Sequence, residues 1–280
     1  MGYITLLPDA PLVWNFILGV IVAMVYVQGI IILMARLVNS GNLSSDLSRK
    51  VIHIAAGSFI WIWLFIDPSD KFSYILNIAV PFLFFLTFLR KGTSGDPEDK
   101  DVKTMTRTGD PRELLKGPLY FTVVMMVAGT LFFGSYAGML MMAIVGWGDG
   151  IAPYIGQKYG KHKFKTFGRE KSIEGSISVF LFSIVGSLIF YILLGIIGSP
   201  GVIGVAETSV LSDPNANFIT MLIIIIIISF IIMIVEALSP ADIDNLLIPA
   251  ATLIMILLIE LFIFPEITLF YETFIRIPFL

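Results

Sequence analysis

The sequence predicts an all-α polytopic membrane protein, from its composition, its long uncharged runs and the placement of its basic residues. Of 280 residues, 57% are hydrophobic and only 14% are charged, with a mean hydropathy of +0.92. Soluble domains contain about 45–50% apolar and about 25% charged residues, so we expect lipid to be the main solvent of this chain. The absence of Cys excludes disulfides and thiolate sites, and two His residues are too few for a multi-histidine metal site.

Eight apolar runs are long enough to be predicted as membrane spans. The fourth and fifth divide one uncharged stretch, Gly117 to Gly148, at the turn-forming sequence Gly134–Gly138. With no internal repeat or soluble domain, residues 1–280 are interpreted as one membrane domain. The predicted spans are residues 12–35, 51–66, 72–89, 118–134, 137–157, 173–197, 217–237 and 245–263.

The basic residues orient these spans. With the N-terminus outside, all of the 18 Lys and Arg residues except Lys71 and Arg276 fall on one face, which the positive-inside rule makes cytoplasmic. This face has two long loops: residues 90–116, predicted to be flexible and given no chemistry, and residues 158–172, a predicted nucleotide loop. The isoleucine-rich spans suggest a prokaryotic plasma membrane.

Unusual polar residues gather on the same cytoplasmic side. Asp149 lies inside an otherwise apolar run, and Glu174 opens the next one. Ionisable groups at membrane depth are costly, so they usually face a cavity, a partner or an ion. Five helix ends bring both signs of charge to this side, which predicts a binding site.

This mixture of groups suits phosphate chemistry. Carboxylates without thiols are hard ligands for Mg²⁺ held together with substrate phosphates, while basic side chains and helix N-termini bind phosphate oxygens. Gly148-Asp149-Gly150 leaves space beside the carboxylate, and Ser172 with Gly175 suits a helix start that approaches a ligand. The prediction is a nucleotide-using membrane enzyme whose lipid substrate arrives from the bilayer.

Each element also has a structural interpretation. The glycines around Asp149 could serve helix packing, and the basic loop 158–172 could contact anionic lipid. His53 could be a satisfied interfacial histidine, and Glu236 could end its helix at the headgroups. A transporter with Asp149 and Glu236 as an intramembrane relay is a further alternative.

Five stretches together resemble the CTP-dependent polyprenol kinases, the family that includes phytol, farnesol and dolichol kinases. They are RKVIHIAAG (49–57), RELLKGPLYF (112–121), GWGDGIAPYIGQKYGKHKF (146–164), KSIEGSISVF (171–180) and EALSPADIDNLLIP (236–249). The resemblance implies Mg²⁺-dependent transfer of the γ-phosphate of CTP to an isoprenoid alcohol, which would yield the alkyl monophosphate and CDP. CTP, the alcohol and membrane lipid are the expected partners; no nucleic-acid binding is expected.

The resemblance also implies roles for individual residues. Asp149, Glu174 and His53 form the expected catalytic set, and Asp149, Glu174, Glu236 and Asp242 the expected metal ligands. The last motif lacks the family's usual glycine and carries an additional acid, so Asp242 and Asp244 both stay candidates. Expected to bind nucleotide or phosphate are Arg49, Lys50, Gly148, Gly150, Lys158, Lys165, Lys171, Ser172, Gly175, Ser176 and Asn245.

Two enzymes with related chemistry are the alternatives. A CTP:phosphatidate-type cytidylyltransferase would make a CDP-lipid, but its expected histidine-containing signature near the C-terminus is missing. A CTP-dependent diacylglycerol kinase would differ only in the lipid alcohol.

Overall fold

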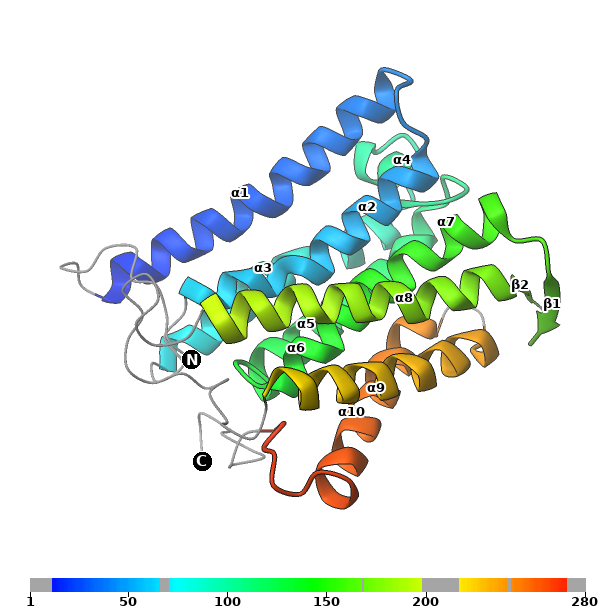
Figure 1. Cartoon of the computed structure of the whole chain (residues 1–280). Coiled ribbons are helices and arrows are strands. Elements are labelled where there is room, and N and C mark those ends of the chain that lie inside the picture. The colour runs from blue at the N-terminus through cyan, green and yellow to red at the C-terminus, as the bar shows by residue number, and fades with distance from the viewer. Residues whose placement is uncertain (1–11, 66–70, 168, 198–216, 241–242, 271–280) are drawn as a thin grey trace.

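The computed structural model describes residues 12–65, 71–167, 169–197, 217–240 and 243–270. Long helices run alongside one another in a single bundle (Figure 1). They are α1 (Leu12–Asn39), α2 (Ser45–Gly57), α3 (Lys71–Ser94), α4 (Lys100–Met105), α5 (Gly117–Leu131), α6 (Tyr136–Ala143), α7 (Gly150–Tyr159), α8 (Ile173–Phe190), α9 (Phe218–Leu238) and α10 (Asp244–Phe262).

Four tighter or wider helical segments join these elements. The 3-10 segments are η1 (Ser58–Phe65) and η2 (Pro111–Leu115), and the π-helical ones are η3 (Ile144–Asp149) and η4 (Tyr191–Ile197). A π-helical turn interrupts the regular ladder and often marks a functional position. Asp149 ends η3, so the structure gives its surroundings an irregular backbone.

Six helical segments in the described part of the chain are long and apolar enough to cross a membrane, in agreement with the predicted class. The predicted second span, 51–66, covers the end of α2 and η1, and the third lies within α3, so the count of eight stays a prediction, as does the orientation. The six segments are Ile17–Asn39, Pro111–Leu131, Tyr136–Tyr159, Ile173–Leu194, Phe218–Leu238 and Asp244–Phe262.

The predicted turn between the fourth and fifth spans is confirmed. Gly134 has a φ of +70°, a left-handed conformation that glycine adopts without strain. Ser135 then caps α6, accepting a hydrogen bond from the backbone N–H of Gly138.

The centre of the bundle is α6 with η3. Every residue from Tyr136 to Gly146 is buried, and Ala137, Leu140 and Val145 are completely so. By contrast, α1 exposes large apolar side chains such as Val25 and Leu33. Inside a bilayer such side chains face lipid, so α1 is a peripheral helix and α6 an interior one.

The two long loops, residues 158–172 and 90–116, contain more secondary structure than the sequence predicted. The loop 158–172, which was predicted to bind nucleotide, contains a hairpin of strands β1 (Lys163–Thr166) and β2 (Arg169–Ser172), paired antiparallel with Lys163 opposite Ser172. The all-α prediction missed it because one short alternating run is a weak strand signal. Loop 90–116 forms α4 and η2, and Lys91 bridges Asp99 and Asp101.

Candidate functional site

A cavity of about 500 Å³ lies at the end of the bundle where most of the basic residues gather. Its walls come from α1, α2, α3, α5 and η2, together with the beginning of α10. Met105 at the end of α4, the following loop with Arg107 and Asp110, and Lys116 between η2 and α5 complete the lining. Residues far apart in the sequence therefore enclose one space.

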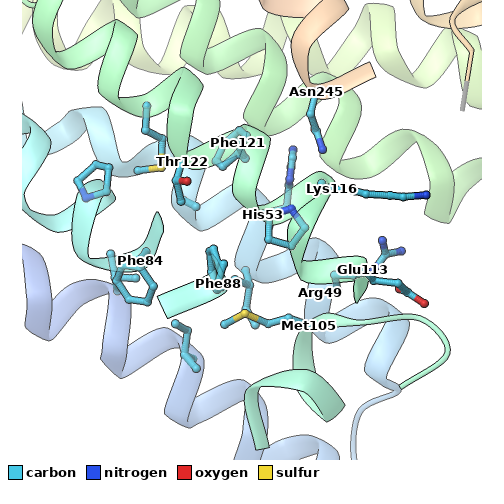
Figure 2. Close-up of a pocket in the computed structure, with 18 of the residues that line it drawn as sticks. Arg49, His53, Phe84, Phe88, Met105, Glu113, Lys116, Phe121, Thr122 and Asn245 are labelled. Carbon is cyan, nitrogen blue, oxygen red and sulfur yellow. The ribbon is translucent and has the colours of Figure 1, made fainter. Parts of the chain in front are cut away.

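One end of this cavity is polar and rich in charged side chains of both signs. Figure 2 shows Arg49, His53, Lys116 and Asn245 gathered on one side, with Phe84 on the opposite side. We call this set the polar end; its residues are Arg49, His53, Arg107, Asp110, Arg112, Glu113, Lys116, Asp244 and Asn245.

The rest of the cavity is apolar. Phe84 and Phe88 line it from α3, and Phe121 and Met125 from α5. Val27 and Ile31 contribute the face of α1. An apolar space with polar groups at one end fits an amphipathic ligand with a charged or hydroxyl head.

Two buried polar atoms at the polar end have no hydrogen-bond partner. They are Oδ1 of Asn245, whose residue is 9% exposed, and Nε of Arg49. Leaving such atoms unsatisfied in a buried place is costly. Buried polar atoms without partners are uncommon in native structures, and two of them at one end of a cavity mark it as a candidate site.

Arg49 and Lys50 lie next to each other in sequence but face different surroundings. Both donate to Asp46, Arg49 at 2.9 Å. Partial burial favours a raised pKa for Asp46, but these hydrogen bonds outweigh it and lower the pKa. Arg49 lines the cavity, whereas Lys50 lies over the ring of Tyr154 on α7, 5.4 Å from its centroid. The structure thus places Arg49 in the cavity wall and Lys50 outside it.

His53 lies where the polar end meets the apolar part. Its Nε2 is 3.1 Å from the carbonyl oxygen of Val145, and its ring packs on Phe121 with centroids 4.5 Å apart. Because a carbonyl only accepts, Nε2 carries the proton in this arrangement. Nδ1 is then the nitrogen available to accept a hydrogen bond.

Asp149 lies directly behind His53, with its Oδ2 3.8 Å from Nε2. The carboxylates of Asp244 and Glu236 are near enough to repel it electrostatically, and Lys171 and Arg107 attract it. Asp149 therefore lies next to the cavity wall that His53 forms, without lining the cavity itself.

The glycines beside Asp149 do not leave the expected open space. A Cβ on Gly148 would collide with Oγ of Ser183 on α8, and one on Gly150 would lie 2.8 Å from Ile54 Cγ1 and 3.1 Å from His53 Cδ2. These residues therefore let α8 and α2 approach closely. They position Asp149 through packing.

Lys171 belongs to a closed cluster outside the cavity. Its Nζ donates to the backbone carbonyl of Glu236, to Oε1 of Glu236 at 2.8 Å and to Oγ of Ser239 at 3.0 Å. An ammonium has three N–H donors, so all are used. We call Lys171, Glu236 and Ser239 the hairpin anchor, because they tie β2 to the end of α9.

The start of α8 is similarly satisfied. Ser172 caps the helix by accepting from the N–H of Gly175, and Gly156 and Gly160 crowd around its Oγ. Glu174 accepts from the backbone N–H of His162 and lies 2.7 Å from its Nδ1. These contacts explain the Ser-x-x-Gly spacing structurally, without a ligand.

The remaining predicted phosphate ligands also lie away from the cavity. Lys158 donates to the Tyr154 hydroxyl on the surface, and Lys165 is exposed on β1. Ser176 is buried in α8 with an unpartnered hydroxyl.

The predicted four-carboxylate metal site is not assembled by the described residues. No group of three or more His, Asp or Glu residues among them is close enough to hold an ion. Glu174 is bound to His162 and Glu236 to Lys171, so each has a different partner from Asp149. Asp242 lies outside the described residues. The structure instead brings Asp244 to the cavity.

The structure adds cavity residues to which the sequence analysis gave no role. Arg107 and Asp110 come from the loop expected to lack chemistry, and Arg112 and Lys116 from the RELLKGP stretch. The RELLKGP stretch was part of the family resemblance, and this resemblance could have identified Arg112 and Lys116 as site residues. No sequence pattern could have identified Arg107, because its position depends on how the loop folds over α2 and α3.

Comparisons with known proteins identify relatives among plant kinases. The chain is 32% identical over 218 residues to a probable chloroplastic phytol kinase 1 of Glycine max, covering 75% of this chain and 66% of that protein. It is 31% identical over 219 residues to chloroplastic phytol kinase 1 of Arabidopsis thaliana, with 76% and 66% covered. A probable chloroplastic phytol kinase of Zea mays is 36% identical over 141 residues, with 50% and 46% covered.

The match therefore covers about 66% of the Glycine max and Arabidopsis thaliana proteins and less than half of the Zea mays protein. No family model matches the chain, and no solved structure does. The relatives are chloroplastic proteins of plants, which gives no support to the predicted prokaryotic plasma membrane. Their identities do bear out the resemblance drawn from the five stretches, and the chain belongs to the polyprenol kinase family that includes the plant phytol kinases.

Proposed function

We propose that this protein transfers a phosphate from a nucleoside triphosphate, CTP by the family resemblance, to an isoprenoid alcohol bound in the cavity. The observation that supports this most strongly is the shape and polarity of the cavity: an apolar space of about 500 Å³ with a polar end where four basic side chains and three carboxylates meet. An isoprenoid alcohol has the matching form, an apolar chain with one hydroxyl. The relatives' names, phytol kinase, point to the same class.

The polar end supplies the charge that phosphoryl transfer requires. Arg49, Arg112 and Lys116 face the same space, and positioning with charge stabilisation is the main task of such catalysts. Arg49 has an unpartnered Nε, and a planar guanidinium suits phosphate oxygens. These side chains hold the transferred phosphate.

His53 orients the alcohol. With Nε2–H held by the Val145 carbonyl, Nδ1 accepts a hydrogen bond from the hydroxyl of a substrate whose chain lies along Phe121. Asp149 lies 3.8 Å from Nε2 of the same ring, and Nδ1 would take up the proton of the hydroxyl as the new bond to phosphorus forms.

Residues at and next to this end also suit Mg²⁺. Asp244 lines the polar end, Asp149 lies behind His53, and Asn245 has an unpartnered amide oxygen. Hard oxygen ligands of this kind bind Mg²⁺ together with phosphate, often with only one or two carboxylates. Mg²⁺ held there would neutralise charge on the phosphates.

The test follows two labels. Purified protein in detergent is given Mg²⁺ with either γ-labelled or α-labelled CTP, and geranylgeraniol, phytol, dolichol, diacylglycerol or phosphatidate. ATP and UTP compete with CTP in parallel. We expect the γ-label to appear on an isoprenoid alcohol.

Other outcomes separate the alternatives. The α-label on phosphatidate would mean a cytidylyltransferase, and the γ-label on diacylglycerol a diacylglycerol kinase. If neither label moved to any acceptor, the kinase proposal would fail and transport through the bundle would become the leading hypothesis.

A further inference from the structure

The apolar part of the cavity has a definite floor. On α5 the cavity-lining residues run from Gly117 to Met125, and on α3 from Phe88 back to Val80. Each run covers nine residues, whose eight steps of 1.5 Å span about 12 Å. Neither helix lines the cavity beyond Val80 or Met125, although both continue for another turn or more.

Close contact between the two helices shuts the space below. A Cβ added to Gly129, one turn beyond Met125, would lie 2.9 Å from Cβ of Asn77, one turn beyond Val80. Without a side chain at Gly129, α3 and α5 approach too closely for a hydrocarbon chain to pass between them. The cavity therefore ends between these helices.

A buried polar side chain, Asn77, lies directly below the apolar residues that form the floor. Asn77 is 2% exposed, and neither atom of its amide has a hydrogen-bond partner. Pro81, four residues later in α3, has no N–H to donate to the backbone carbonyl of Asn77. An apolar chain end gains nothing by reaching such groups.

We propose that Met125 and Val80, resting on the Asn77–Gly129 contact, set the length of the isoprenoid chain that the protein accepts. This inference rests on the proposed function. A space of this volume encloses most of a drug-sized ligand, a class into which a diterpene alcohol falls and a long polyprenol does not. We therefore expect short isoprenoid alcohols to be used in preference to dolichol-type alcohols.

The test shortens and lengthens the cavity. Met125→Trp fills the floor, and Met125→Ala deepens it. Met126→Trp is the matched control, because the neighbouring methionine does not line the cavity. Each protein is given geraniol, farnesol, geranylgeraniol, phytol and dolichol, and both phosphorylation and equilibrium binding of the radiolabelled alcohol are measured.

We expect Met125→Trp to shift the preference between geranylgeraniol and farnesol by about tenfold toward the shorter alcohol. Met125→Ala should shift it toward the longer one, and Met126→Trp should leave it unchanged. Equal use of dolichol and geranylgeraniol by the wild type would contradict the proposed length limit. The same preference for chain length in all four proteins would contradict it too.

The binding measurement separates this proposal from the kinase proposal. If binding follows the predicted dependence on chain length but no phosphate is transferred, the length limit is supported and the kinase activity is not. If phosphate is transferred with no dependence on residue 125, the kinase activity is supported and the length limit is not. A misfolded Met125→Trp protein is recognised by gel filtration, and Met125→Ala then carries the test.

Discussion

The polar end of the cavity and the hairpin anchor both bring Lys or Arg side chains close to carboxylates at the same end of the molecule, yet their hydrogen bonding differs. In the anchor, Lys171 uses all its donors on Glu236 and Ser239. In the polar end, Arg49 Nε and Asn245 Oδ1 are buried without partners. A satisfied network stabilises a fold, whereas unsatisfied buried groups around a cavity are suited to a ligand.

The comparison changes how the motifs are interpreted. KSIEGS, expected to bind nucleotide, is used for capping and anchoring, while RELLKGP lines the cavity. A phosphate group would have to break existing contacts to reach Lys171. At the polar end it would complete missing ones.

The largest expected effect is from Asp149→Asn. Removing this carboxylate from behind His53 should lower the rate of phosphate transfer by about a thousandfold. The protein should still be extracted and elute as the wild type does, because the substitution keeps the shape of the side chain. Initial rates with labelled CTP and geranylgeraniol give the measurement.

Glu98→Gln is the control for Asp149→Asn. It removes one carboxylate charge at an exposed position paired with Lys103, and activity should not change. If Asp149→Asn kept wild-type turnover, Asp149 would have no part in the reaction.

Next in size is the effect of Lys171→Met. It leaves the Glu236 carboxylate, whose side chain is 12% exposed, without its cation, and this should lower the free energy of unfolding by about 3 kcal/mol. The double variant Lys171→Met/Glu236→Gln should recover much of that loss. Thermal unfolding in detergent measures both.

The KM for CTP distinguishes an anchor from a phosphate ligand. We expect Lys171→Met protein that remains folded to keep a KM within a few fold of the wild type. A large rise in KM with no loss of thermal stability would assign Lys171 to the nucleotide instead.

A smaller effect is expected from Asn245→Ala. The substitution removes an amide oxygen that has no partner in the protein, so stability should be retained while KM for substrate rises about tenfold. Asn42→Ala, on the exposed turn after α1, is the control. Loss of stability without a change in KM would show that Asn245 acts in packing alone.

The smallest effect is expected from Lys165→Ala. Its side chain is exposed on β1, and exposed charges contribute little individually. KM for CTP should rise by no more than about twofold, and less at high salt. A tenfold rise would indicate that the hairpin folds over the nucleotide, so that it would bind nucleotide in addition to being held to α9 by the hairpin anchor.

The sequence by itself was enough to predict that the protein lies in lipid, that it is all-α and that it belongs to this family. Apolar runs predict helices in lipid because no other structure satisfies the backbone there, and Gly134 predicts its turn because the conformation is local. The five motifs were sufficient to identify the polyprenol kinases, since they depend only on the order of residues along the chain.

Only the tertiary structure decided which polar residues are available to a ligand. Lys171 and Arg49 are both basic residues beside predicted spans, and nothing in their neighbours reveals that one meets Glu236, 65 residues away, while the other faces a cavity. The same holds for Gly148, Gly150 and Gly129, whose packing partners lie on other helices. Pairing and burial depend on contacts between distant segments, and these exist only once the helices have packed.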